Sequence, residues 1–150
     1  GIDCPVKRAV SPEVICRLMT DRKPLPGKLA FSRDLFVLLF LLRGMPFVDL
    51  AFLRRCDLQG NVITYHRRKT SRKLTVVVGK EAMEIIQKYM YAIPDSPYLF
   101  PIIQNPGKDE YGQYARMLRL QNYRLTQVAN ILGIRDRLST YMAKHNQFSI

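Results

Sequence analysis

A net charge of +12 over 150 residues, from 24 lysines and arginines against 12 acids, is the most informative bulk property of this chain. Hydrophobic residues make up 47% of the sequence, which is enough for one domain with a real core and excludes a disordered tail. The excess of positive charge favours a polyanionic partner, whether nucleic acid, an anionic membrane surface or an acidic protein.

Cys4, Cys16 and Cys56 are an odd number of cysteines without CxxC spacing, which argues against a disulfide framework and against a zinc site. We therefore expect no metal or other cofactor, a reducing cytoplasmic setting, and cysteines that act as small buried apolar groups. The longest apolar run, residues 35–42, is far shorter than the ~20 residues that span a bilayer. Residues 1–10 lack the apolar core of a signal peptide.

The chain is expected to begin with a basic linker, residues 1–10, followed by a first helix. Residues 11–13, Ser-Pro-Glu, are typical of a helix start because they combine an N-cap serine, a proline in the first turn and an early acid. We expect this helix to end near Met19. Residues 21–28 contain prolines and a glycine and predict a loop.

A second helix is expected to have Ser32 as its N-cap. Its body, residues 35–42, is apolar on every side, which predicts a central buried helix that ends at residues 43–44, Arg-Gly. A third, short helix is predicted from Pro46, with its apolar side chains pointing inward. These side chains are Phe47, Leu50, Ala51 and Leu53.

The periodicity then changes to that of strands. Residues 61–66 and 74–78 are rich in β-branched side chains and flank the basic segment 67–73, so they predict a β-hairpin with a strongly basic tip. Gly79 ends the hairpin, and residues 81–91 return to helical spacing.

The last third of the chain is predicted to be a loop followed by helices. Residues 94–107 form a proline-rich loop, and a long helix of about residues 111–132 is closed by Gly133 at its C′ position. Ser139 or Thr140 is expected to cap a final helix that continues to the end of the sequence. The whole predicts a mainly α fold with a small antiparallel sheet (α+β), and the lack of βαβ alternation speaks against a doubly wound fold.

The basic residues are concentrated in two stretches, in each of which a single acid opposes them, Asp57 in the first and Asp136 in the second. The first stretch contains Arg54, Arg55, Arg67, Arg68, Lys69, Arg72 and Lys73. The second contains Arg116, Arg119, Arg124, Arg135, Arg137 and Lys144, interleaved with Tyr111, Tyr114, Tyr123 and Tyr141. A solvated basic face is the ordinary explanation for any one arginine, but the concentration of one sign favours nucleic-acid binding. No helix pairs a basic face with an exposed apolar stripe, so the membrane alternative is weaker.

Four stretches of the chain carry residues that could take part in chemistry. They are LRGMPFVDLAFLR at 42–54, YHRRKTSRKLTV at 65–76, SPYLFP at 96–101 and LSTYMAKH at 138–145. Together they resemble the catalytic domain of bacterial tyrosine recombinases of the phage-integrase type, over about residues 8–148. The first is similar to the branch of the family with the pattern R-G-M-x-F-x-D-x-x-x-L. The broader family has an acid three residues after the arginine, where this chain has Pro46, and Asp49 comes later.

This resemblance implies the fold of that catalytic domain and a set of catalytic positions. They are Arg43, Lys69, Tyr141, Lys144 and His145. The chemistry is phosphoryl transfer, in which preorganised cations stabilise the charge that develops on the non-bridging oxygens. Arg43 would bind two of these oxygens with its planar fork, Lys69 would protonate the leaving 5′-oxygen, and His145 would act as an acid or base or brace the phosphate. The DNA-binding residues implied are Arg54, Arg55, Arg67, Arg68, Arg72, Lys73, Arg116, Arg119 and Arg124.

Two departures from the family pattern matter. Lys144 stands where the family has arginine, and lysine keeps the charge but loses the bidentate fork. The nucleophilic tyrosine of the family follows this box further along the chain, and Tyr141 lies on the box itself. We therefore expect residues 11–150 to be a catalytic domain that lacks its final segment and does not cleave DNA as given. Residues 1–10 would be the linker from a missing N-terminal DNA-binding domain.

The predicted function is site-specific DNA recombination or integration through a 3′-phosphotyrosyl intermediate, in a mobile-element enzyme of the bacterial cytoplasm and nucleoid. Its partner would be double-stranded DNA, bound as a homotetramer by the complete protein, while this stretch alone could be monomeric. The alternative is a non-catalytic DNA-binding module, a decayed or regulatory recombinase remnant. An RNA-binding protein is a weaker alternative because the chain has no RNP-type aromatic pair or GXXG clamp.

Ordinary structural roles also remain open for the single residues. Arg43 could only cap the buried helix, Lys69 could bind phosphate without chemistry, and Lys144 and His145 could lie on the surface of the last helix. Three further residues are expected to serve the fold alone: His66 as a strand residue, and Tyr65 and Tyr98 in packing.

Overall fold

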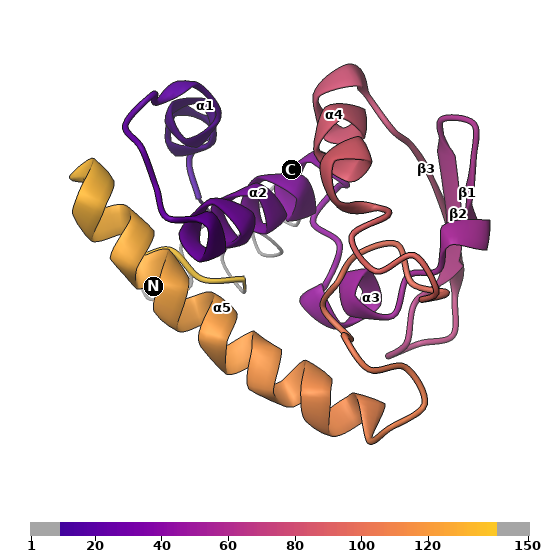
Figure 1. Cartoon of the computed structure of the whole chain (residues 1–150). Helices are drawn as coiled ribbons and strands as arrows, with labels where there is room; N and C mark the ends of the chain where they lie inside the picture. Colours follow the sequence, from indigo (N-terminus) through magenta and orange to yellow (C-terminus); the bar gives the residue numbers. More distant parts are fainter. Residues whose placement is uncertain (1–9, 141–150) are drawn as a thin grey trace, which may run out of the picture. The chain divides into compact units, whose positions relative to one another are not determined.

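The structure is a computed structural model of the chain, and it describes residues 10–140. They form helices and a three-stranded antiparallel sheet, which confirms the predicted α+β class (Figure 1). The chain divides into two compact units. Unit 1 extends up to Pro46 and resumes at Arg119, and unit 2 comprises Phe47–Leu118. The long helix α5 (Glu110–Leu132) contributes residues to both units.

Helix α1 (Pro12–Thr20) of unit 1 begins where the Ser-Pro-Glu signal predicts it. Ser11 is the N-cap, and its side-chain oxygen accepts a hydrogen bond from the backbone N–H of Val14 at 3.2 Å. This bond satisfies one of the N–H groups that a helix start leaves without a partner. Ile15 and Leu18 are buried, so one face of the short helix packs on the core of unit 1.

Helix α2 (Gly27–Leu41) begins earlier than expected, so the prediction of Ser32 as its N-cap is wrong. Pro26 precedes the helix with φ −54°, and its carbonyl accepts a hydrogen bond from the N–H of Leu29. Proline suits a helix start because it has no N–H that needs a partner there. Ser32 is instead buried within the helix, together with the apolar body at 35–39, as predicted for a central helix.

The second half of α5 belongs to unit 1 and matches the predicted long helix, with Gly133 closing it at φ 69°. The side-chain amide of Gln121 donates to the backbone carbonyl of Ser32 at 2.8 Å, and both residues are buried. After Gly133, the backbone N–H of Thr140 donates to the side-chain oxygen of Asn122 at 3.0 Å. The helix predicted to follow Thr140 lies outside the described residues.

Unit 2 starts with helix α3 (Phe47–Ala51), which confirms the predicted third helix. The four side chains expected to point inward are all buried. They are Phe47, Leu50, Ala51 and Leu53. A 3₁₀ turn, η2 (Arg55–Asp57), leads from this helix to the sheet.

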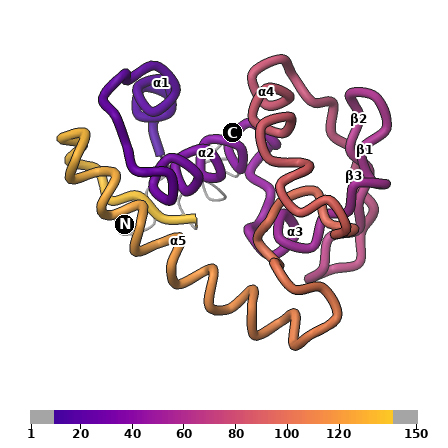
Figure 2. The backbone as a smooth tube through the Cα atoms, in the orientation of Figure 1, coloured from indigo at the N-terminus to yellow at the C-terminus, as the bar shows by residue number. Residues whose placement is uncertain are grey.

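The sheet of unit 2 contains β1 (Leu58–Gln59), β2 (Val62–His66) and β3 (Lys73–Val77), which lie together in Figure 2. They are hydrogen-bonded in the order β1-β2-β3. β2 and β3 are the predicted hairpin, and their register runs from Val62 opposite Val77 to His66 opposite Lys73. β1 was not predicted as a strand, because two residues are too few to show a period. It pairs with β2 through Leu58 opposite Ile63.

Helix α4 (Lys80–Tyr89) follows β3 after Gly79, as predicted, and the proline-rich loop leads from it to α5. The start of this loop is tied to the segment after α3 by backbone hydrogen bonds. The N–H of Leu99 donates to the carbonyl of Leu53 at 2.8 Å, and the N–H of Arg55 donates to the carbonyl of Pro97 at 2.9 Å. Leu99 is fully buried, so this part of the loop belongs to the core of unit 2.

The cysteines do not behave as expected. Cys16 and Cys56 are free and exposed, so the prediction of buried apolar cysteines is wrong for both, and Cys4 lies outside the described residues. In α1 the buried positions are Ile15 and Leu18, so Cys16 is on the outer face of the helix. No helix in the described part of the chain has both the length and the apolarity needed to cross a membrane.

Candidate functional site

Helix α2 ends with an arginine at the position that usually holds glycine. The N–H of Gly44 donates to the carbonyl of Leu39 at 2.8 Å, and the N–H of Arg43 donates to that of Phe40 at 3.1 Å, which together make a Schellman motif. Arg43 is at its C′ position with φ 67°, in the left-handed region. A side chain there costs on the order of 1 kcal/mol relative to glycine.

The side chain of Arg43 is exposed and makes no hydrogen bond or ion pair with another residue of the described part. A helix cap uses only the backbone of this residue, and glycine would provide that backbone without strain. The guanidinium therefore contributes nothing visible to the fold while its backbone is strained. This combination favours a function for Arg43 over the simple capping role.

The tip of the β2–β3 hairpin is a closed turn that presents Lys69. The N–H of Arg67 donates to the carbonyl of Arg72 at 2.8 Å, and the carbonyl of Arg67 accepts from the N–H of Ser71 at 2.6 Å. Ser71 has φ 61°, which allows the chain to return toward β3. Lys69, Arg72 and the neighbouring Lys73 are exposed, so this tip carries cations into solvent.

The base of this tip is fastened to α3. Asp49 is 3% exposed, and its Oδ1 accepts a hydrogen bond from the backbone N–H of Arg68 at 2.9 Å. Its Oδ2 lies 3.9 Å from Nε of Arg67. The guanidinium carbon of Arg68 is 4.1 Å from the centre of the Phe52 ring, a cation–π distance. Arg67 and Arg68 are therefore partly engaged inside the unit, whereas Lys69 is not.

Two phenols are close enough to the same carboxylate to feel its charge, the buried Tyr65 and the half-buried Tyr114. Burial raises the pKa of Tyr65, and the negative charge of Asp49 raises it further. Burial likewise raises the pKa of Tyr114, and the nearby Tyr111 and Asp49 raise this pKa further. Both phenols stay protonated at neutral pH, so they add no negative charge next to Asp49. Tyr65 and Tyr98 are buried, as expected for packing residues, and His66 is an exposed strand residue.

A cavity of about 160 Å³ opens beside the base of the hairpin. Its lining combines the cations Arg54 and Arg68 and the ring of His66 with the carboxylates Asp49 and Asp57, next to the rings of Phe52 and Tyr65. The two carboxylates offset the two arginines, so the excess of positive charge is at the exposed hairpin tip and not in this cavity. In the described part of the chain, no group of three or more His, Cys, Asp or Glu side chains could hold a metal ion.

Arg55 has a different environment from the other predicted DNA-binding arginines. Its guanidinium donates to three backbone carbonyls after α4, those of Met90, Ile93 and Pro94, at 2.9, 2.6 and 2.8 Å. It also lies 5.1 Å from the centre of the Tyr91 ring. Because its donors already have partners, we assign Arg55 a structural role and leave it out of the proposed DNA contacts.

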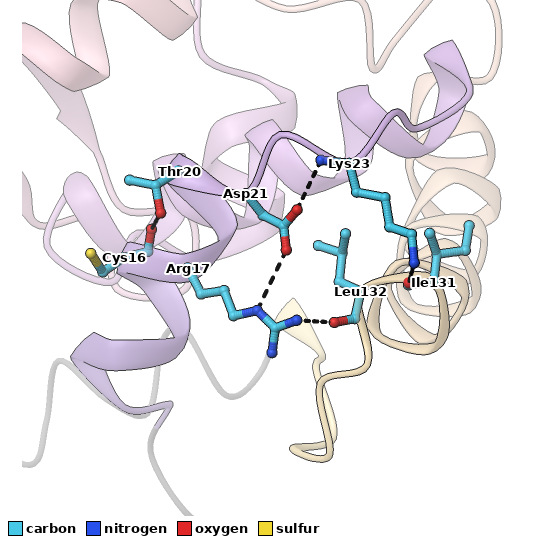
Figure 3. A network of polar contacts seen from close by, with 7 residues as sticks. All are labelled: Cys16, Arg17, Thr20, Asp21, Lys23, Ile131 and Leu132. Carbon is cyan, nitrogen blue, oxygen red and sulfur yellow. Dashed lines mark hydrogen bonds and ion pairs between the residues drawn. The ribbon is translucent and has the colours of Figure 1, made fainter.

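Two further cations that the sequence did not single out satisfy the carboxyl end of α5 in unit 1 (Figure 3). Arg17 donates to the carbonyl of Leu132, and Lys23 donates to that of Ile131 at 3.1 Å. Asp21 joins them, with its Oδ1 accepting from the N–H of Lys23 and its Oδ2 3.5 Å from Nε of Arg17. The hydrogen bond from Lys23 and the charge and hydrogen bond of Arg17 hold the pKa of Asp21 below its ordinary value.

The loop before α5 is fixed by a tyrosine–carboxylate pair. The hydroxyl of Tyr98 donates to Oε1 of Glu110 at 2.6 Å, and the N–H of Gly107 donates to Oε2 at 2.8 Å. Burial, followed by the bond to Glu110, raises the pKa of Tyr98 to about 12. The hydrogen bond from Tyr98 is the main cause that lowers the pKa of Glu110, and the bond from Gly107 lowers it further. The positive charges of Arg54 and Arg68 act in the same direction.

The remaining predicted residues are distributed over α5 and the end of the chain. Arg116 is exposed in unit 2, Arg119 is exposed in unit 1, and Arg124 is half-buried there. Three catalytic predictions lie outside the described residues. They are Tyr141, Lys144 and His145.

The structure thus groups the predicted cations by unit. Arg54, Arg68 and the hairpin tip with Lys69 are together in unit 2. Arg43 belongs to unit 1, so its convergence with Lys69 on one phosphate stays a prediction. Sequence reasoning gave Asp49 and Phe52 no role, although both lie within the quoted motif at 42–54.

The fold resembles that of a solved recombinase. Over 93% of its length the chain aligns with a structure described as "Crystal structure of XerA recombinase", with a TM-score of 0.61 and 16% sequence identity. The chain spans 48% of that structure's length. No model of a known protein family matches the chain, and no curated protein matches it by sequence. At this identity the likeness establishes the fold, which is the α+β fold of a recombinase.

Proposed function

We propose that this chain is most of the catalytic domain of a tyrosine recombinase, a DNA strand-transferase that cuts and rejoins DNA through a 3′-phosphotyrosyl bond. The observation that carries the proposal is Arg43. An exposed arginine occupies a strained glycine position on a fold shared with a recombinase, inside the motif that resembles the first-arginine segment of the family. Such a conformational cost is expected where a side chain serves a site rather than the fold.

The proposed reaction follows from the chemistry of these side chains. A tyrosine beyond residue 150 gives its phenolic proton to a base, which would be His145 or water, and attacks the phosphorus of a DNA phosphodiester. The new tyrosyl O–P bond forms, and the bond to the 5′-oxygen breaks. Lys69 gives its proton to that leaving oxygen, and the same lysine takes a proton back when the 5′-hydroxyl attacks in the rejoining step. Arg43, Lys144 and His145 stabilise the charge on the non-bridging oxygens.

Exposure supports the assignment of Lys69. A proton donor must reach into the groove of DNA, and the hairpin holds this lysine at its tip with no competing partner among residues 10–140. Arg54, Arg72, Lys73, Arg116 and Arg119, all exposed, are the proposed backbone contacts. We expect the complete protein to work as a homotetramer on two duplexes, in the bacterial cytoplasm.

The test is covalent capture of DNA. A chain extended past Ile150 to its next tyrosine should form a protein–DNA adduct on a nicked duplex, and Arg43→Ala should reduce the rate of adduct formation by roughly 10²–10³-fold because it removes charge stabilisation. Arg43→Lys should recover only part of it, since the bidentate fork is lost. An extended chain that binds duplex DNA but forms no covalent adduct with it would contradict the proposal.

A second candidate is the non-catalytic DNA-binding module, and Lys144 is the observation that favours it, because the family has arginine there. Salt-dependent binding to duplex DNA without an adduct, even after Lys144→Arg in the extended chain, would support this candidate instead. Adduct formation that increases with Lys144→Arg would support the strand-transferase and identify residue 144 as part of the phosphate clamp.

A further inference from the structure

The carboxylate of Asp49 has a location that needs explanation. It is nearly fully buried in the first turn of the short helix α3, and an ionised group is costly in such a place unless it has partners. Its two oxygens face the backbone N–H of Arg68 and the guanidinium of Arg67, which are the first two residues of the hairpin tip. A buried carboxylate of unit 2 therefore holds the tip by its base.

A second contact from the same segment acts on the same residue. Phe52 directly follows α3, and its ring lies against the guanidinium of Arg68 at 4.1 Å. Arg68 is thus held twice, by its backbone through Asp49 and by its side chain through Phe52. These contacts join α3 to a hairpin tip that the β-ladder alone, which ends at His66 opposite Lys73, leaves outside the sheet.

Lys69 is the next residue along the chain. Its backbone is fixed on one side by the held Arg68 and on the other by the turn that the Arg67 carbonyl closes with the N–H of Ser71. Its side chain is exposed and has no partner in residues 10–140. The backbone of Lys69 is therefore held from both sides, while its ammonium stays available to a ligand such as DNA.

We infer that Asp49 is a positioning residue for Lys69, which it serves by fixing the adjacent Arg68 backbone, and this inference rests on the proposed role of Lys69 as the proton donor. Loss of the anchor would let the tip move. A displacement of about 1 Å at a reacting group can reduce a rate by about 10²-fold. Asp49 would not touch the DNA itself.

The experiment compares two leaving groups in a chain extended to the nucleophilic tyrosine. On an ordinary phosphodiester, Asp49→Ala should slow cleavage by roughly 10–100-fold and Lys69→Ala by roughly 10²–10⁴-fold. On a substrate with sulfur in place of the 5′-bridging oxygen, the thiolate leaves without a proton. Both variants should then cleave within about tenfold of the unaltered chain, because the step they impair is no longer needed.

Matched variants isolate the effect of position. Asp49→Asn keeps an oxygen for the Arg68 N–H and should retain more activity than Asp49→Ala. Asp109→Ala removes another carboxylate of unit 2 that accepts a backbone N–H, that of Gly112 at 3.2 Å, and should leave cleavage within about threefold of the unaltered chain. Equal losses in Asp49→Ala and Asp109→Ala would overturn the inference.

The outcomes separate this inference from the proposed function. If sulfur restores cleavage to Lys69→Ala but not to Asp49→Ala, the positioning role is wrong and the recombinase proposal stands. If sulfur restores cleavage to neither variant, Lys69 is not the proton donor, and the part of the proposed function that gives Lys69 this role is wrong. In the 150-residue chain, Asp49→Ala should also speed amide exchange at Arg68 while the β2–β3 ladder keeps its protection. If Asp49→Ala fails to fold, Phe52→Leu removes the second anchor and should give a smaller loss that sulfur also restores.

Discussion

The carboxyl end of α5 and the tip of the β2–β3 hairpin are both rich in cations but use them in opposite ways. At the end of α5, Arg17 and Lys23 donate to the carbonyls of Leu132 and Ile131, which the helix leaves without internal partners (Figure 3). At the hairpin tip, the exposed ammonium of Lys69 has no partner in residues 10–140.

This difference shows that a net charge of +12 is not a count of DNA contacts. Some cations complete helix ends and stabilise the fold, and Arg55 does the same after α4. Others, at the hairpin tip, have a backbone fixed by hydrogen bonds and a charged group exposed to solvent. Substitutions in the two groups should therefore have different consequences, one on the free energy of unfolding and the other on DNA.

The largest effect is expected at Arg55, because three carbonyls lose their donor at once. Arg55→Met should reduce the free energy of unfolding by roughly 2–4 kcal/mol, from hydrogen bonds of a charged donor to partly buried acceptors. Arg72→Met removes the same charge at the exposed tip and should change it by less than about 0.5 kcal/mol. Urea denaturation of both variants measures the contrast, and equal losses would refute the division into two groups.

At the hairpin tip, substitutions should weaken DNA binding and leave the free energy of unfolding unchanged. Replacing Lys69, Arg72 and Lys73 together with alanine should leave stability unchanged and weaken duplex binding by roughly tenfold or more. The slope of log affinity against log salt should become less steep by about 2–3, since each lost phosphate contact contributes about 0.9. Titrations at several salt concentrations test this, and a slope that stays the same would remove the tip from the DNA interface.

A third variant tests the tyrosine–carboxylate pair that fixes the loop before α5. Tyr98→Phe should cost about 1–2 kcal/mol at neutral pH by removing the bond to Glu110. Because the pKa of Glu110 in the folded state lies below its ordinary value of 4.5, this contribution is present above pH 4.5 and is lost as the pH falls through the lowered pKa. Melting curves of both proteins should therefore converge in acid, and a gap independent of pH would contradict the pair.

The smallest effect has an unusual sign. Arg43→Gly should raise the free energy of unfolding by about 0.5–1 kcal/mol, because glycine adopts φ 67° without strain. Arg43→Ala should not, since alanine keeps the Cβ. Both variants should lose adduct formation in the extended chain. Destabilisation by Arg43→Gly would mean that the arginine side chain serves the fold after all.

The sequence predicted the elements whose signals are local. The Ser-Pro-Glu start of α1, the β-branched strands β2 and β3, and Gly133 after α5 each act within a few residues, and each prediction is confirmed. The start of α2 was predicted wrongly because Ser32 has the side chain of a cap but lies buried inside the helix, and Pro26 sets the start instead.

The candidate site was predictable only in part. The motif at 42–54 pointed to Arg43, but the hydrogen bond of Asp49 to Arg68 joins residues 19 apart and has no local signal. The role of Arg55 is equally hidden, since its carbonyl partners lie 35 to 39 residues away along the chain. Composition shows how many cations there are, and only tertiary structure shows which of them already have partners.

The most direct test of the account is the distance between residues 43 and 69 in the chain bound to duplex DNA. Spin labels at these two positions, with Cys4, Cys16 and Cys56 replaced by serine, would report it in solution. If both side chains meet one scissile phosphate, their backbones must lie within roughly 20 Å of each other, allowing for the reach of an arginine, a lysine and the phosphate between them. A single narrow distribution well beyond that distance would contradict the account.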